Sequence, residues 1–61
     1  MPIVNVKLLE GRTDDQLKAL VSEVTQAVEK TTGANKEAIQ VVIEEMNPAH
    51  YGVAGVRKSD Q

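Results

Sequence analysis

The fold of this chain is constrained most strongly by two segments that have the pattern of β-strands. They lie on either side of one long amphipathic segment. Residues 3–9 alternate along the backbone, and such a period of two is typical of a strand. Val4, Val6 and Leu8 would lie on one face, and Ile3, Asn5, Lys7 and Leu9 on the other. Glu10 and Gly11 end the segment. We therefore predict a first strand over residues 3–9.

The following segment has the signals of an α-helix. Thr13 and Gln16 have the spacing of a capping box, and Asp14 and Asp15 place negative charge at the positive end of the helix dipole. Apolar residues then recur at helical spacing up to about residue 32: Leu17, Leu20, Val21, Val24 and Val28. Gly33 is the expected C-terminal cap.

A second strand is predicted after a short link over residues 34–37. Residues 39–43 are rich in β-branched side chains, residues 44–46 extend the run, and Asn47-Pro48 ends it. In the tail, Gly52 and Gly55 enclose a short apolar segment, which favours a small hairpin. The fold class is therefore α/β, a single β-α-β unit with parallel strands, a right-handed crossover and a C-terminal hairpin.

Such a unit leaves one face of its sheet uncovered, and parallel sheets are seldom open to water. The chain has 61 residues, which we take as one domain over residues 1–61. It has no cysteine and one histidine, so disulfides are excluded and a bound metal is not expected. Self-association is the remaining way to stabilise so small a unit, and we predict a homo-oligomer.

Charge and hydropathy exclude other classes of protein. The net charge is −2 and the seven Lys and Arg residues are scattered, so no nucleic-acid partner is expected. The longest apolar run is too short for a bilayer, and the N-terminal residues lack the pattern of a signal peptide. We expect a cytoplasmic protein without a membrane partner.

Two residues are candidates for the chemistry, although a proline here can serve only processing and an arginine here can be a solvated surface residue. Processing commonly removes Met1 before a small residue, and Pro2 would then present a secondary amine, whose unperturbed pKa of about 8 suits a general base. Arg12 precedes a helix N-terminus, where a cation is unfavourable for the helix but well placed to bind a carboxylate. Seven strand residues, at about 3.3 Å each, separate the two by some 23 Å. Cooperation between Pro2 and Arg12 therefore requires two chains.

Pro2-Ile3-Val4 followed by Leu8-Leu9-Glu10-Gly11-Arg12, with His50-Tyr51-Gly52 in the tail, closely resembles the 4-oxalocrotonate tautomerase family. The resemblance covers essentially the whole chain. It implies a tautomerase/MIF-like fold assembled as a homohexamer, a trimer of dimers, with cofactor-free pockets. It also implies that Pro2 is the general base for small 2-hydroxydienoate or enol acids, which become 2-oxo acids. Arg12 of a neighbouring subunit would hold the substrate carboxylate, and Tyr51 and Leu9 would form apolar pocket walls.

One position departs from the family pattern. The best-known members have a second arginine near the start of the second strand, and Gln40 stands there in this chain. Gln40 donates only a neutral hydrogen bond, so a slower or differently selective tautomerase is expected.

Two alternatives stay open at the level of sequence. The first is hydration or dehalogenation of acrylate-like acids, which the same family includes. The second is a non-enzymatic oligomeric protein in which Gln40 marks lost activity. Among other polar residues, His50 is assigned to a turn, Glu44 and Glu45 point to opposite strand faces, and Arg57 has only a weak case for reaching a neighbouring pocket.

Overall fold

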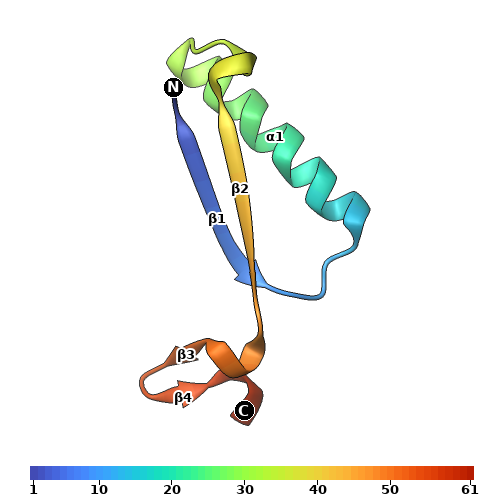
Figure 1. Cartoon of the computed structure of the whole chain (residues 1–61), viewed down its shortest axis with the longest axis vertical. Coiled ribbons are helices and arrows are strands. Elements are labelled where there is room, and N and C mark those ends of the chain that lie inside the picture. The colour runs from blue at the N-terminus through green and yellow to red at the C-terminus, as the bar shows by residue number, and fades with distance from the viewer.

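In the computed structural model, which describes all 61 residues, two strands and a helix form the body and a short hairpin forms the tail (Figure 1). The body comprises β1 (Ile3–Leu9), α1 (Asp14–Thr32) and β2 (Gln40–Met46), and the tail contains β3 (Gly52–Val53) and β4 (Val56–Arg57). Single 3₁₀ turns occupy Lys36–Ala38, Pro48–His50 and Lys58–Asp60. The predicted α/β class, with a β-α-β unit followed by a hairpin, is confirmed.

The two long strands pair in parallel along their whole length. Ile3 lies opposite Gln40 and Leu9 lies opposite Met46, with no break in register. Because side chains alternate between faces, Val4, Val6 and Leu8 lie half-buried on one face. α1 packs against β2, so this is the covered face (Figure 1). Ile3 and Val42 lie on the other face, where they remain 59% and 44% exposed.

The helix begins and ends at the predicted residues. Thr13 Oγ1 accepts a hydrogen bond from the Gln16 amide at 3.1 Å, and the Thr13 amide donates to Gln16 Oε1 at 2.9 Å. Gly33 closes the helix with a φ of 77°, and its amide donates to the Glu29 carbonyl. This left-handed conformation is one that glycine adopts without a Cβ penalty. Of the predicted apolar face, Val21 is the most exposed residue, at 38%.

The second strand begins one residue later than predicted. The link forms a 3₁₀ turn at Lys36–Ala38, and the Ile39 amide donates to the Lys36 carbonyl at 3.0 Å. That amide therefore closes the turn, and the ladder starts at Gln40. Ile39 is also the one buried residue of the chain.

The tail packs mainly against itself at the far end of the sheet (Figure 1). The predicted hairpin turns at Ala54 and Gly55, both with positive φ, as in the type I′ two-residue turn. The Lys58 amide donates to the Tyr51 carbonyl at 2.8 Å, and Arg57 pairs with Asp60 at 2.9 Å.

The chain is much more open than a self-sufficient domain of its size. Its radius of gyration is 14.4 Å, whereas about 10 Å is typical for this length. Its accessible surface is 4651 Å², compared with about 3,900 Å² for a folded monomer of this mass. One residue of 61 is buried. Several large apolar side chains, including Ile3, Val42, Val53 and Val56, are therefore free to pack against another chain. The helix is not apolar enough to cross a membrane.

We expect Val42→Glu to break the protein into smaller assemblies, because a carboxylate buried between chains without a partner costs several kcal/mol. Sedimentation velocity measures the species directly. Gln26→Glu is the matched control, since it adds the same charge on the exposed side of α1 and should leave the sedimentation coefficient unchanged. If Val42→Glu sediments like the unchanged chain, the open sheet face does not contact another copy.

Candidate functional site

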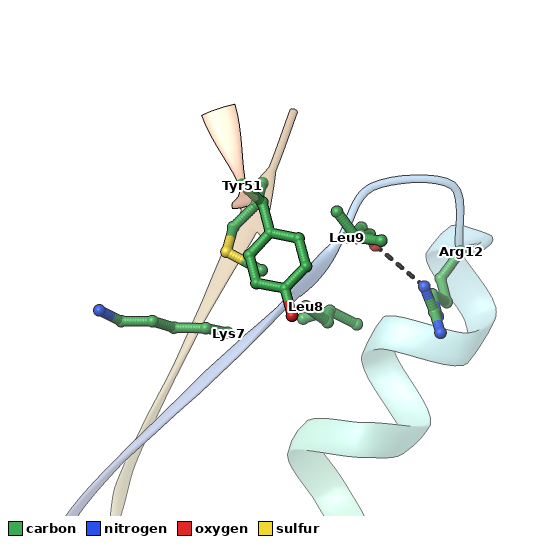
Figure 2. A pocket seen from close by; sticks show the side chains of 6 residues that line it. Lys7, Leu8, Leu9, Arg12 and Tyr51 are labelled. Atoms are coloured by element: carbon green, nitrogen blue, oxygen red, sulfur yellow. Dashed lines mark hydrogen bonds between the residues drawn. The ribbon is translucent and has the colours of Figure 1, made fainter. Parts of the chain in front are cut away.

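A pocket of about 550 Å³ lies where the carboxyl ends of β1 and β2 meet the start of the tail (Figure 2). Leu8, Leu9 and Met46 supply aliphatic walls, and Lys7, Arg12 and Tyr51 supply the polar groups. The register explains part of this lining, because Leu9 and Met46 are paired at the end of the sheet. The pocket thus combines an apolar wall with cationic and hydroxyl donors.

Arg12 is positioned by the turn between β1 and α1. Gly11 has a φ of 125°, which few other residues adopt, and it brings the chain from the strand to the capping residue Thr13. Arg12 Nη1 donates to the Leu9 carbonyl at 3.0 Å (Figure 2). No carboxylate of the chain lies within ion-pair distance of this guanidinium. Its remaining N–H groups are free to bind an anion at the pocket, close to the helix N-terminus.

Tyr51 forms the aromatic side of the pocket. Its ring stands between Lys7 and Arg12, and its hydroxyl points along the pocket toward Leu8 (Figure 2). The backbone is fixed on both sides of the ring. Asn47 Oδ1 accepts from the Ala49 amide in the preceding turn, and the Tyr51 carbonyl accepts from Lys58. The tail therefore holds an aromatic ring over the end of the sheet.

Pro2 and Gln40 lie at the opposite end of the sheet from this pocket. The Gln40 amide donates to the Pro2 carbonyl at 3.0 Å, at the point where β1 begins (Figure 1). The five predicted site residues thus fall into two groups: Leu9, Arg12 and Tyr51 at one end, and Pro2 with Gln40 at the other. The predicted separation of Pro2 from Arg12 along the strand is present, and no single chain brings the two groups together.

Met1 is accessible to a processing enzyme, because it is 78% exposed, and Pro2 behind it is half-buried. With Met1 in place, the Pro2 nitrogen is an amide without basic character. Loss of Met1 would remove no strand residue and would convert that nitrogen to a secondary amine.

Other polar residues of the sequence lie outside the pocket. His50 is exposed in the turn Pro48–His50, and Glu44 accepts from Asn5 Nδ2 at 3.0 Å on the open sheet face. Arg57 donates two hydrogen bonds to Asp60, at 2.9 and 3.2 Å. No three His, Cys, Asp or Glu residues gather where they could hold a metal ion.

Sequence reasoning did not identify Lys7, Leu8 or Met46 as pocket residues. Alternation places Leu8 under the helix, and Lys7 has the character of a surface residue on a strand. These residues line the pocket because they lie at the carboxyl ends of the two strands and the tail brings Tyr51 over those ends. The one usable signal was the expected parallel pairing, which aligns the ends of both strands.

Comparison with known proteins gives a consistent result along the whole chain. Residues 2–61 match the family model described as "Tautomerase enzyme". "Probable tautomerase SSP1389" of Staphylococcus saprophyticus is 85% identical over 61 residues, which is all of both chains. The crystal structure of SAR1376 from methicillin-resistant Staphylococcus aureus is also 85% identical, with a TM-score of 0.89 over 97% of this chain and 95% of that one. YwhB, a homologue of 4-oxalocrotonate tautomerase, is 60% identical, with a TM-score of 0.95 over 98% of each chain.

The pocket predicts that carboxylates bind through Arg12. Arg12→Ala should weaken the binding of a small carboxylate such as butanoate by about tenfold or more, because a charge-assisted fork is lost. Titration followed by NMR chemical shifts measures the affinity. Arg57→Ala is the control, since that guanidinium is engaged by Asp60, and its affinity should match that of the unchanged chain. Equal affinities for Arg12→Ala and the unchanged chain would contradict the assignment.

Proposed function

The chain belongs to the tautomerase family, and we propose that it is a cofactor-independent isomerase that moves a proton in small 2-hydroxydienoate or enol acids to give 2-oxo acids. One observation carries the proposal. An unpaired Arg12 guanidinium lines an apolar-walled pocket, in a chain with proline behind an exposed Met1. A carboxylate anchor and a secondary amine are the two groups that such a proton transfer needs.

In the proposed mechanism, Pro2 is the general base after Met1 has been removed. Its amine takes a proton from the enol acid and returns it to a carbon atom of the same molecule, so no other reactant is consumed. An α-amino group has an unperturbed pKa of about 8, which allows both steps near neutral pH. Apolar surroundings favour the neutral amine.

The substrate carboxylate is bound by Arg12 of another chain in this mechanism. Pro2 and the Arg12 pocket lie at opposite ends of β1, so a neighbouring copy has to bring its pocket to this chain's Pro2. Leu9 and Tyr51 line that pocket and keep water from the reacting atoms. We propose a homohexamer, a trimer of dimers, in the cytoplasm, which is the assembly that the family resemblance implies.

We propose that Gln40 acts beside Pro2. Its backbone amide donates to the Pro2 carbonyl, so both residues belong to the same end of the sheet. The side chain would donate a neutral hydrogen bond to the substrate. Because it carries no charge, it should stabilise a dianionic dienolate less than an arginine would.

The role of Pro2 is tested by ketonisation of phenylenolpyruvate. A form that retains Met1, in which the Pro2 nitrogen is an amide, should have a kcat/KM lower by at least about 100-fold, which is typical for the loss of a general base. Pro2→Ala without Met1 keeps a primary amine in place of the ring's secondary amine, and it should be slower by about tenfold because that amine is less well oriented. Intact mass must first show that Met1 is present in the first form and absent from the unchanged chain and Pro2→Ala. Thr31→Ala on the exposed end of α1 controls for the effects of substitution and should keep full activity. Equal rates for the unchanged chain and the form that retains Met1 would rule out the amine as the base.

A charge at position 40 should redirect selectivity. We expect Gln40→Arg to raise kcat/KM for 2-hydroxymuconate, a dicarboxylate, by about tenfold relative to phenylenolpyruvate, because a second cation can bind the second carboxylate. Gln40→Met has similar length without charge and should show no such gain. An unchanged ratio of the two kcat/KM values for Gln40→Arg would place position 40 away from the substrate.

The same assays separate the alternatives. Release of chloride from 3-chloroacrylate without ketonisation would favour a dehalogenase or hydratase that activates water. Failure of every assay on mature protein, together with no effect of Arg12→Ala on ligand binding, would favour an oligomeric protein without catalytic activity.

A further inference from the structure

The pocket holds one polar group that carboxylate binding leaves unused. The Tyr51 hydroxyl lines the same pocket as Arg12 and makes no hydrogen bond within the chain. A phenolic hydroxyl can donate one hydrogen bond, and the neighbouring aliphatic walls offer it no acceptor. A ligand that fills the pocket therefore meets a free donor beside the guanidinium.

We propose that Tyr51 Oη donates a hydrogen bond to the oxygen on carbon 2 of a 2-oxo or enol acid whose carboxylate is bound by Arg12. The inference deepens the proposed function and takes its substrate class from it. Such a hydrogen bond would make the pocket selective for ligands that have an oxygen atom on the carbon next to the carboxylate. The phenol keeps its own proton, and the proton that Pro2 removes is the one returned to carbon.

The positions of the two donors support this assignment. The Arg12 side chain donates to the Leu9 carbonyl, and the backbone of Tyr51 is held by the bond from the Lys58 amide to its carbonyl, so the ring extends into the pocket from an ordered backbone. In a 2-oxo acid, the oxo carbon is bonded directly to the carboxylate carbon. Once the guanidinium holds the carboxylate, the adjacent oxygen lies within the pocket, where Tyr51 projects its hydroxyl (Figure 2).

Lys7 is the other donor in the pocket, and its geometry is less suitable. Its side chain runs away from Arg12 on the far side of the Tyr51 ring (Figure 2). On the sheet it lies opposite Glu44, the acidic neighbour that faces it across the strand pair. Tyr51 is therefore the donor that shares the carboxylate end of the pocket with Arg12.

The hydroxyl would also affect the chemical step. When Pro2 removes a proton, negative charge develops on the oxygen of carbon 2, and a donor aimed at that atom stabilises the charge. A neutral donor gives less stabilisation than a cation. The side chain at position 40 is also uncharged, so both proposed donors outside Arg12 are of this neutral kind.

Binding of two matched ligands tests the proposal without any turnover. The ligands are 2-oxobutanoate and butanoate, which differ in the oxygen on carbon 2, and NMR titration gives both affinities. The unchanged chain should bind 2-oxobutanoate about 3- to 10-fold more tightly, as one net hydrogen bond allows. Tyr51→Phe keeps the ring and should reduce this preference to near one. Lys7→Met should retain the preference, and Arg12→Ala should weaken both ligands together.

Two results would overturn the inference. One is equal binding of both ligands by the unchanged chain, an outcome that does not depend on whether any variant folds. The other is a preference that persists in Tyr51→Phe. Repeating the titrations on Pro2→Ala separates the two proposals, because that variant should slow ketonisation and still distinguish the ligands. In kinetics, Tyr51→Phe should lower kcat for phenylenolpyruvate by at least about tenfold.

Discussion

A two-stranded parallel sheet with one helix can cover only one of its two faces, and the rest of this structure depends on that constraint. One residue of 61 is buried, and Ile3 and Val42 remain exposed on the uncovered face. Without disulfides, the chain has no covalent means of offsetting so small a core. Contact with other copies is then the remaining source of apolar burial. In the proposed assembly, the same contact that stabilises the fold would also bring Pro2 of one copy to the Arg12 pocket of another.

The length of β1 links this assembly to the proposed chemistry. Pro2 lies before the strand and Arg12 lies after it, so the strand itself keeps the proposed base and anchor apart. In the proposed mechanism, a site forms only where the beginning of one strand meets the end of another. A substitution that disrupts packing between chains would then remove activity without touching any site residue.

Local signals in the sequence were sufficient for the elements, because each depends on neighbouring residues. The Thr13–Gln16 capping box, the left-handed Gly33 and the turn at Ala54-Gly55 are decided within a few residues. The late start of β2 was not predictable, because it depends on whether the Ile39 amide joins a turn or the ladder. Lys7 and Met46 were missed for a related reason, since the pocket depends on where the tail packs. The resemblance to a known family supplied the roles of Leu9 and Tyr51, which periodicity alone does not provide.

The polar groups of the proposed site divide between binding and catalysis. Arg12 would hold a carboxylate equally in the substrate and in the transition state, and such uniform binding does not by itself raise kcat. Rate has to come from groups that respond to the charge developing on the oxygen of carbon 2. In this chain the proposed candidates, the Tyr51 hydroxyl and the Gln40 amide, are both neutral donors. A site built in this way should recognise small enol and 2-oxo acids through Arg12 and Tyr51. It should convert the enol acids at a moderate rate, since the Arg12 cation lies at the carboxylate and not at the reacting oxygen.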